Sequence, residues 1–211
     1  LTRLTTTSTV EYYPSPSPDG SKIAFASSKD GNYEIYVIES DGSNPTRLTN
    51  NGAPDFPSTG SWSPDGSRIA FTSGRNGSYG IYVMNDDGSG QTSLTSGDST
   101  DYLPAWSPDG SQLAIVASQG GEHHILLRTP GRKKLKTLVT LDKAARSLSW
   151  SPDGSLIAFS SFVPVDPEPF VTLPSPPEGA SWAEPARVID KMIYRRDGSG
   201  YVKAGNRQLF V

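Results

Sequence analysis

Trp62-Ser63-Pro64-Asp65-Gly66-Ser67 is one copy of a segment that recurs through this 211-residue chain. The Ser-Pro-Asp-Gly-Ser part occurs four times unchanged, and an Arg-Asp-Gly-Ser sequence provides a fifth, related copy. Measured between their aspartates, successive copies are 46, 44, 44 and 44 residues apart. The five aspartates are Asp19, Asp65, Asp109, Asp153 and Asp197. So regular a spacing indicates one structural unit that is repeated along the chain.

Each copy predicts a small antiparallel sheet. Pro64-Asp65-Gly66 favours a tight turn, because proline fixes φ, aspartate bonds nearby backbone and glycine accepts a positive φ. Residues 68–73, 80–84 and 91–95 are strand-like and are separated by glycine-containing turns. Four short strands in a repeat of this length are typical of a β-propeller blade. The sequence therefore predicts an all-β fold, a β-propeller of four-stranded antiparallel blades.

The spacing also predicts the domain organisation. We expect a single propeller domain, 1–211, with about five blades, either as a closed five-bladed ring or as an arc of a larger propeller. The blades are predicted at 11–49, 55–95, 101–140 and 148–189, followed by a partial blade at 190–211, with a proline-rich insertion at about 162–187. Since the chain does not begin with Met, we expect a mature product or a fragment.

The first residues repeat an outer strand. Leu1-Thr2-Arg3-Leu4-Thr5 matches Thr46-Arg47-Leu48-Thr49. We expect residues 1–5 to complete the last blade or to be left over from a preceding one. An arc would leave strand edges unpaired, and such edges favour self-association.

A tryptophan marks three of the repeats. Trp62, Trp106 and Trp150 each stand three residues before the aspartate of the turn. Recurrence at one structural position predicts that these side chains pack between adjacent blades. The alternative interpretation is an aromatic platform for a ligand.

Composition excludes several classes of function. A net charge of −3 provides no basic field for nucleic acid, and the single basic run, Arg132 to Lys136, is short enough to be a solvated hairpin. The absence of cysteine excludes disulfides, thiolate metal sites and cysteine nucleophiles. No apolar run approaches the ~20 residues of a membrane span, and no signal peptide is visible. The compartment stays open, with the cytoplasm favoured over the periplasm.

Candidate metal and catalytic residues are few. Asp86-Asp87-Gly88 and Asp30-Gly31-Asn32 bring oxygens together, but neither continues into an EF-hand loop with its distal Glu. We therefore predict plain turns, no metal site and no cofactor. His123 and His124 are neighbours in a predicted strand, where successive side chains point to opposite faces. The two imidazoles are therefore not expected to join one site.

The repeat resembles the TolB-type propeller repeat over residues 1 to about 161. That repeat has a Trp-Ser-Pro-Asp-Gly turn followed by Ile-Ala-Phe, Ile-Tyr-Val and Arg-Leu-Thr strands. The corresponding segments here are 62–66, 69–71, 81–83 and 47–49. The resemblance implies the fold and leaves the function open, because a propeller is a scaffold.

Residues 182–201 resemble part of the propeller of prolyl oligopeptidase-family serine peptidases, especially the acylaminoacyl-peptidase-like and dipeptidyl-peptidase-like branch. There a Tyr-Arg-x-Asp-Gly-x-Gly-Tyr segment follows a proline-rich stretch, as Tyr194 to Tyr201 does here. The resemblance implies a parent protein in which a propeller of about seven blades covers an α/β-hydrolase domain and admits only short peptides. This chain has no Gly-x-Ser-x-Gly segment, so we do not expect it to be an enzyme by itself.

Three functions follow from these observations. The first is a non-catalytic propeller segment related to the substrate-gating propeller of such a peptidase. The second is a stand-alone TolB-like propeller that binds a protein or peptide, and the third is a self-associating structural fragment. The expected partner is accordingly a peptide or protein, with an α/β-hydrolase domain as one candidate, or a second copy paired through open blade edges.

The candidate binding residues come from the peptidase-like segment. Arg195 or Arg196 could pair with a peptide carboxylate through a bidentate contact. The alternative is that these side chains only solubilise a blade edge. The full set is Glu184, Tyr194, Arg195, Arg196 and Tyr201.

Overall fold

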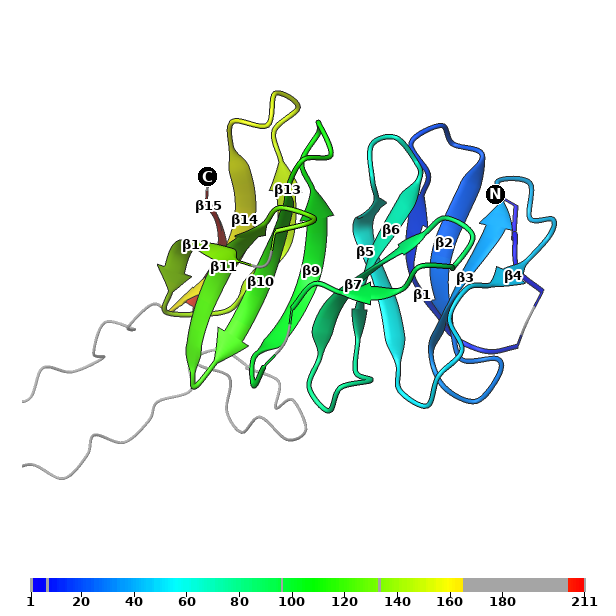
Figure 1. Ribbon diagram of the computed structural model, residues 1–211, viewed down its shortest axis with the longest axis horizontal. Coiled ribbons are helices and arrows are strands. Elements are labelled where there is room, and N and C mark those ends of the chain that lie inside the picture. Colours follow the sequence, from blue (N-terminus) through cyan, green and yellow to red (C-terminus); the bar gives the residue numbers. More distant parts are fainter. Residues whose placement is uncertain (1, 7, 96, 133, 165–204, 211) are drawn as a thin grey trace, which may run out of the picture. The chain divides into compact units, whose positions relative to one another are not determined.

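The computed structural model describes residues 2–6, 8–95, 97–132, 134–164 and 205–210, and all regular secondary structure in them is β-strand (Figure 1). The strands form three sheets of four strands and one sheet of three described strands. This arrangement confirms the prediction of an all-β fold built from four-stranded antiparallel blades. The chain divides into two compact units, residues 1–161 with 209–211 and residues 162–208. Within the described part, no helix has the length and apolar character that a membrane crossing requires.

Each sheet is built from consecutive strands. The first sheet contains β1 (Glu11–Pro16), β2 (Lys22–Ser27), β3 (Glu34–Glu39) and β4 (Thr46–Arg47). The second contains β5 (Asp55–Trp62), β6 (Arg68–Ser73), β7 (Gly80–Asn85) and β8 (Thr92–Ser93). The third contains β9 (Thr100–Trp106), β10 (Leu113–Gln119), β11 (Glu122–Arg128) and β12 (Leu135–Leu141). The fourth contains β13 (Ala145–Trp150), β14 (Ile157–Pro164) and β15 (Gly205–Phe210), in that order.

The fourth sheet differs from the predicted organisation in its third strand. From the sequence, residues 190–211 were expected to belong to a partial fifth blade. In the structure Gly205–Phe210 follows β14 in the fourth sheet. Residues 165–204, which hold most of the predicted insertion and the end of the predicted fourth blade, lie outside the described residues.

Both faces of the second sheet are buried, which explains its nearly continuous apolar strands. Ile69 lies opposite Met84 and Phe71 lies opposite Tyr82, and these four side chains pack against Val37 of the first sheet. The opposite face packs against the third sheet. The residues of that second cluster are Ala70, Ile81, Leu94, Trp106, Leu113 and Ile115. Successive side chains of a strand point to opposite faces, so when both faces of a sheet are covered, consecutive residues of its strands are apolar and buried.

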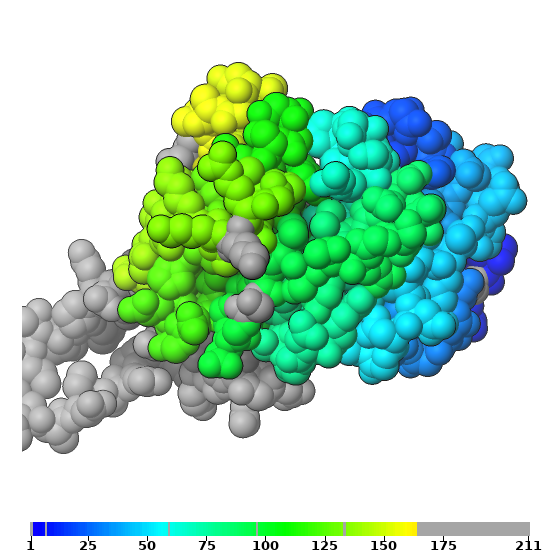
Figure 2. Space-filling model, in the orientation of Figure 1, coloured from blue at the N-terminus to red at the C-terminus, as the bar shows by residue number. Residues whose placement is uncertain are grey.

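The first strands of the sheets lie along a common axis. β1 contacts β5, β5 contacts β9 and β9 contacts β13, whereas the fourth strands lie at the periphery (Figure 1). Figure 2 shows the surfaces of the first three sheets following one another in chain order, from blue to green. We call the boundary between two neighbouring sheets a seam, and number the seams in chain order.

The repeated tryptophans close the three seams with one hydrogen bond each. The indole Nε1–H of Trp62 donates to the carbonyl of Ser15 in the preceding sheet, over 3.0 Å. Trp106 donates in the same way to Ser61, and Trp150 to Ala105, again over 3.0 Å. Trp62 and Trp106 are buried and Trp150 is half-buried. Each indole therefore packs on apolar neighbours and also donates a hydrogen bond to a backbone carbonyl of the adjacent sheet.

The N-terminal segment takes the place of a preceding outer strand. Leu4 packs against Phe25, Tyr36 and Ile38 of the first sheet, as Leu48 packs against the second. A Cβ added at Gly42 would lie 2.9 Å from the carbonyl oxygen of Leu4, and one added at Gly88 would lie 2.8 Å from that of Leu48. Leu48 directly follows the fourth strand of the first sheet. Leu4 therefore has the position, next to the first sheet, that the end of a fourth strand from a preceding sheet would have, although residues 2–6 form no strand. This position agrees with either origin expected for residues 1–5.

We predict that Trp106→Phe lowers the free energy of unfolding by about 1–3 kcal/mol, because the buried Ser61 carbonyl loses its donor. Trp150→Phe removes the same bond at a half-buried site, where water can replace the indole, and should lower it less. Urea denaturation followed by circular dichroism measures both values. Equal losses, or none at Trp106, would contradict the structural role given to the bond.

Candidate functional site

The two ends of the first strands differ in chemistry. At one end, each first strand runs into the Ser-Pro-Asp-Gly-Ser turn, and we call this the turn end. At the other end the first strands begin, close to the starts of the third strands. This end carries a group of tyrosine and phenylalanine side chains, and we call it the aromatic end.

A bulge interrupts the first strand of every sheet near the aromatic end. The register with the second strand shifts at this point in all four sheets. A residue with positive φ lies in each bulge. These residues are Tyr13 (54°), Gly60 (79°), Leu103 (54°) and Ser147 (57°). Three of the four are not glycine, so the sheets hold a conformation that L-residues adopt only at a cost. Bulges of this kind redirect side chains and often lie beside functional sites.

Five aromatic side chains form a continuous row across the first seam. Their ring centroids are 5.3 to 6.4 Å apart, close enough for each ring to contact the next. Tyr12, Tyr13 and Tyr79 expose 45, 52 and 38% of their surface. The members, which we call the aromatic row, are Tyr12, Tyr13, Tyr33, Phe56 and Tyr79.

Backbone hydrogen bonds hold the row in place. The amide of Asp55 donates to the carbonyl of Tyr33 in the first sheet over 2.8 Å, and the amide of Asp101 donates to that of Tyr79 over 2.7 Å. These bonds cross the first and second seams directly beside the aromatic rings. Three row members therefore lie next to backbone that is fixed to the neighbouring sheet, which gives the exposed surface a defined shape.

A buried carboxylate supports the same region. The side chain of Asp55 accepts hydrogen bonds from Arg75 and from Asn51, both over 2.7 Å. Burial raises the pKa of Asp55, against the lowering effect of its hydrogen bonds and of the Arg75 charge. Arg75 also lies over the Tyr82 ring, 4.6 Å from its centroid. This network anchors the start of β5, from which Phe56 extends into the aromatic row.

The aromatic row presents rigid ring surfaces and several tyrosine hydroxyls. Such side chains contact peptides with large apolar area, donate hydrogen bonds and lose little conformational entropy on binding. Within the described residues, the row contains no nucleophile paired with a base.

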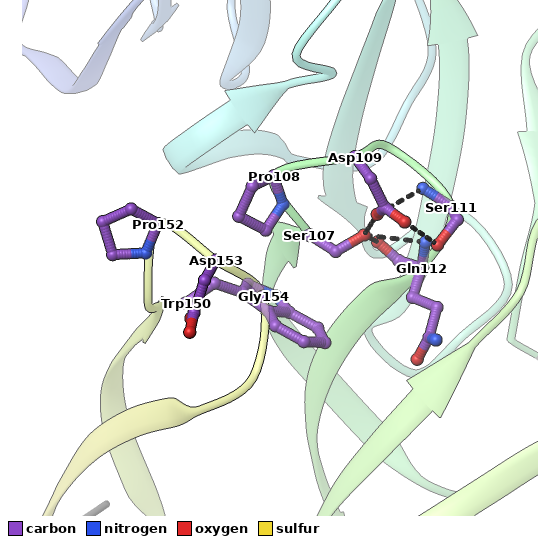
Figure 3. A pocket seen from close by; sticks show the side chains of 9 residues that line it. All are labelled: Ser107, Pro108, Asp109, Ser111, Gln112, Trp150, Pro152, Asp153 and Gly154. Atoms are coloured by element: carbon purple, nitrogen blue, oxygen red, sulfur yellow. Dashed lines mark hydrogen bonds between the residues drawn. The ribbon is translucent and has the colours of Figure 1, made fainter.

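The turn end contains a pocket at the third seam, with a volume of about 350 Å³ (Figure 3). The turn of the third sheet lines one side, and Trp150 with the turn of the fourth sheet lines the other. An equivalent pocket of about 410 Å³ lies at the first seam. The repeat therefore places a pocket between two consecutive turns, with the tryptophan ring as part of its wall.

Each turn aspartate is bonded within its own turn. In the third sheet, Ser107 Oγ donates to Asp109 Oδ1 over 2.6 Å, the amide of Ser111 donates to the same oxygen, and the Ser111 hydroxyl donates to Asp109 Oδ2. These donors, Ser107 first, lower the pKa of Asp109 to about 2. The same arrangement lowers the pKa values of Asp19, Asp65 and Asp153 to about 2. The carboxylates shape the turns, so the pockets are not built to use them as acids or bases.

The two histidines bind different partners. His123 Nδ1 lies 2.6 Å from Ser118 Oγ, and His124 Nδ1 lies 3.1 Å from Thr140 Oγ1. The Glu122 carboxylate lies 3.6 Å from His124 Nε2. Among the described residues, no carboxylate forms an ion pair with His123, so none orients the imidazole of the Ser118–His123 pair as a catalytic triad requires.

In the two turns that resemble part of a calcium loop, the aspartates have hydrogen-bond or ion-pair partners. Asp87 accepts the amide of Ser89, and Asp30 accepts the Tyr36 hydroxyl. Among the described residues, no group of three or more acidic, histidine or cysteine side chains could hold a metal ion.

The sequence-based site residues and the aromatic row do not coincide. Glu184, Tyr194, Arg195, Arg196 and Tyr201, together with the fifth repeat aspartate Asp197, lie outside the described residues, so their roles stay predictions. Sequence reasoning missed the aromatic row, although a signal was present. An acidic residue, one or two bulky residues and a proline precede the turn in three copies. These segments are Glu11-Tyr12-Tyr13-Pro14, Asp55-Phe56-Pro57 and Asp101-Tyr102-Leu103-Pro104.

Comparison with known proteins places the chain among related folds. Residues 2–167 match PD40, the TolB beta propeller domain. A putative TolB from Agrobacterium tumefaciens is 27% identical, with a TM-score of 0.61 over 70% of this chain and 57% of that one. TolB from Acinetobacter baumannii is 30% identical, with a TM-score of 0.60 over 70% of this chain and 37% of that one. The chain therefore spans only part of the length of either protein.

The structure of a prolyl endopeptidase is also similar to that of this chain. It is one of two prolyl endopeptidases for which a role of inter-domain dynamics in catalysis and specificity is described. It is 18% identical, with a TM-score of 0.52 over 73% of this chain and 25% of that one. At this identity the likeness shows the fold alone. Together, these findings confirm the predicted resemblance to TolB-type repeats and to prolyl oligopeptidase-family propellers.

We predict that Ser147→Gly raises the free energy of unfolding by about 0.5–1 kcal/mol, because relief of the left-handed backbone outweighs the entropy that glycine adds to the unfolded chain. Ser149→Gly, two residues along the same strand but paired regularly with Ala158, should lower it by about the same amount. Thermal and urea unfolding of both variants measure these changes. A loss of stability in both would show that the bulge carries no strain.

We predict that Asp109 stabilises the fold at neutral pH and loses this contribution in acid. Its folded pKa of about 2 lies below the value of about 3.9 expected in the unfolded chain. The contribution is therefore complete above the unfolded pKa and disappears as the pH falls toward 2. Ser107→Ala removes the strongest donor and should raise the pKa of Asp109. Carbon-13 NMR titration of the Asp109 carboxyl tests this, and an ordinary aspartate pKa in the unchanged protein would refute it.

Proposed function

The chain belongs to the TolB beta propeller domain family, and from that membership we propose that it is a non-catalytic propeller segment that binds a peptide or protein through its aromatic row. One observation carries the proposal. Five rings, each in contact with the next, cross a seam; Tyr12, Tyr13 and Tyr79 are exposed, and inter-sheet hydrogen bonds hold the backbone at Tyr33 and Tyr79. A monomeric surface rarely keeps so large an exposed aromatic group without a binding role.

The place of the row within the fold supports the same conclusion. It lies where the first strands begin, close to the axis along which the four first strands contact one another. In propellers and other scaffolds, binding residues concentrate on the loops and strand ends that a rigid framework presents. The bulges at Tyr13 and Leu103 turn the first strands at this point, which is where a ligand on the axis would meet them.

A gating role beside a peptidase domain is the more specific form of this proposal. It rests on the peptidase-like segment at 182–201 and on the similarity to a prolyl endopeptidase propeller. In that form the partner is an α/β-hydrolase domain, and peptides contact the aromatic row on their way to it. The identity to two TolB proteins favours the other form, an interaction propeller that acts without a hydrolase domain.

Selection from a random peptide library tests the binding role without knowledge of the partner. We predict that the chain enriches specific peptides, and that Tyr13→Ala and Tyr79→Ala each weaken their binding about fivefold or more, as truncation of a central tyrosine costs more than about 1 kcal/mol. Leu156→Ala is the matched control, because Leu156 is an exposed apolar side chain at the turn end.

The outcome distinguishes the aromatic row from a non-specific apolar contact. Retention of binding by Leu156→Ala and its loss in both tyrosine variants would support the proposal. Equal binding by all three variants would refute it. Addition of a hydrolase domain from a related peptidase separates the two forms, since only the gating form predicts a complex with it.

A further inference from the structure

A buried arginine occupies an apolar position of the repeat. Ile38 in the first sheet lies opposite Ile23, and Met84 in the second lies opposite Ile69. The same position in the third sheet, opposite Leu113, is Arg128. Ile38 and Met84 are 3% and 1% exposed, and Arg128 is 8% exposed. A guanidinium thus stands where the other two sheets bury an uncharged, apolar side chain.

Arg128 faces the second seam. Its cross-strand partner Leu113 also lies opposite Trp106, and both belong to the cluster that packs against Ala70 and Ile81 of the second sheet. Residues directly opposite each other on paired strands share a face of the sheet. The side chain of Arg128 therefore extends from the face of the third sheet that packs against the second sheet.

The guanidinium is incompletely satisfied within the described structure. Its Nε and Nη1 atoms are buried and have no hydrogen-bond partner. A buried charge without a partner is strongly destabilising, so such groups are normally paired or hydrogen-bonded. An anion is the kind of ligand that removes this penalty.

A second arginine stands across the same seam. Arg68 precedes Ala70 by two residues on β6, so the alternation of the strand places it on the face that meets the third sheet. The equivalent residue of the first sheet, Lys22, forms an ion pair with Asp86 across the first seam, over 3.4 Å. In the third sheet the position of Asp86 is taken by Pro130, which has no charge.

At its turn end, the second seam therefore has a cation on each side. Among residues 2–6, 8–95, 97–132 and 134–161, no ion pair joins Arg68 or Arg128 to a carboxylate. The nearest repeat aspartates, Asp65 and Asp109, already accept hydrogen bonds from the serines of their own turns.

Exposed basic residues continue from this seam. Arg132, Lys134 and Lys136 follow Arg128 in the turn between β11 and β12 and at the start of β12, and all three are exposed. The basic run seen in the sequence thus follows directly after a buried arginine, where it raises the local concentration of anions.

We propose that the turn end of the second seam binds an oxyanion, a carboxylate or a phosphate group, between Arg68 and Arg128. Arginine suits this role because its planar guanidinium donates to two oxygens of one anion at once. The exposed side chains of Arg132, Lys134 and Lys136 steer the ligand to the seam. The site lies at the opposite end of the first strands from the aromatic row and is independent of peptide binding there.

Titration with two probes tests the proposal, inorganic phosphate for a phosphate group and triglutamate for the carboxylates of an acidic peptide. Nitrogen-15 NMR follows the Nε–H signal of Arg128, and differential scanning fluorimetry follows the midpoint of unfolding. We expect the Arg128 signal to shift and saturate with at least one probe, and the same probe to raise the unfolding midpoint. The probe that acts identifies the source of the oxyanion.

Three variants make the test specific. Arg128→Met introduces the residue that the second sheet uses at this position, so it should fold and should lose binding at least tenfold. Arg68→Gln introduces the residue of the third sheet and should weaken binding severalfold. Arg146→Gln, an exposed arginine at the start of β13, is the control and should bind as the unchanged protein does. Equal binding by Arg128→Met, or no shift of the Arg128 signal with either probe, would overturn the proposal.

Discussion

The indole-to-carbonyl hydrogen bond across each seam is the interaction on which the arrangement of the sheets depends. Apolar packing alone would hold two sheets face to face in several registers, because dispersion and burial have no direction. A single Nε1–H donor and a single buried carbonyl define one register. The bond recurs at Trp62, Trp106 and Trp150 with the same length, 3.0 Å, so each sheet meets its predecessor in the same way.

The two ends of the first strands are constrained differently, and their chemistry reflects this. The turn end is closed by the tryptophan and by serine hydroxyls that bind the turn aspartate. The aromatic end is fixed by backbone bonds from Asp55 and Asp101, which leave the side chains beside them free to vary. The residues that hold the sheets together therefore repeat at the turn end, whereas the side chains at the aromatic end differ from sheet to sheet. The second seam is an exception at the turn end, since Arg68 faces Pro130 where the first seam has a Lys22–Asp86 ion pair, and Arg128 takes the place of an apolar residue.

The sequence predicted the sheets well because their determinants are local. Proline, aspartate and glycine specify each turn, and alternating apolar residues specify the strands that follow it. The aromatic row could not be predicted in the same way, because its members come from the first strand of one sheet and the third strand of another. Only the inter-sheet bond of Asp55 brings Phe56 beside Tyr33. Likewise, Arg128 looks like the ordinary polar end of a strand until its register with Leu113 shows that it is buried.

Because each sheet contacts mainly its neighbours in the chain, the stability of the first unit is close to a sum over sheets and seams. Such a molecule need not unfold all at once, since a break in one seam separates it into two halves that each keep their internal contacts. At the second seam, two buried nitrogens of Arg128 have no hydrogen-bond partner among the described residues. An anion bound there, as proposed above, would therefore couple the unfolding of the second and third sheets more tightly.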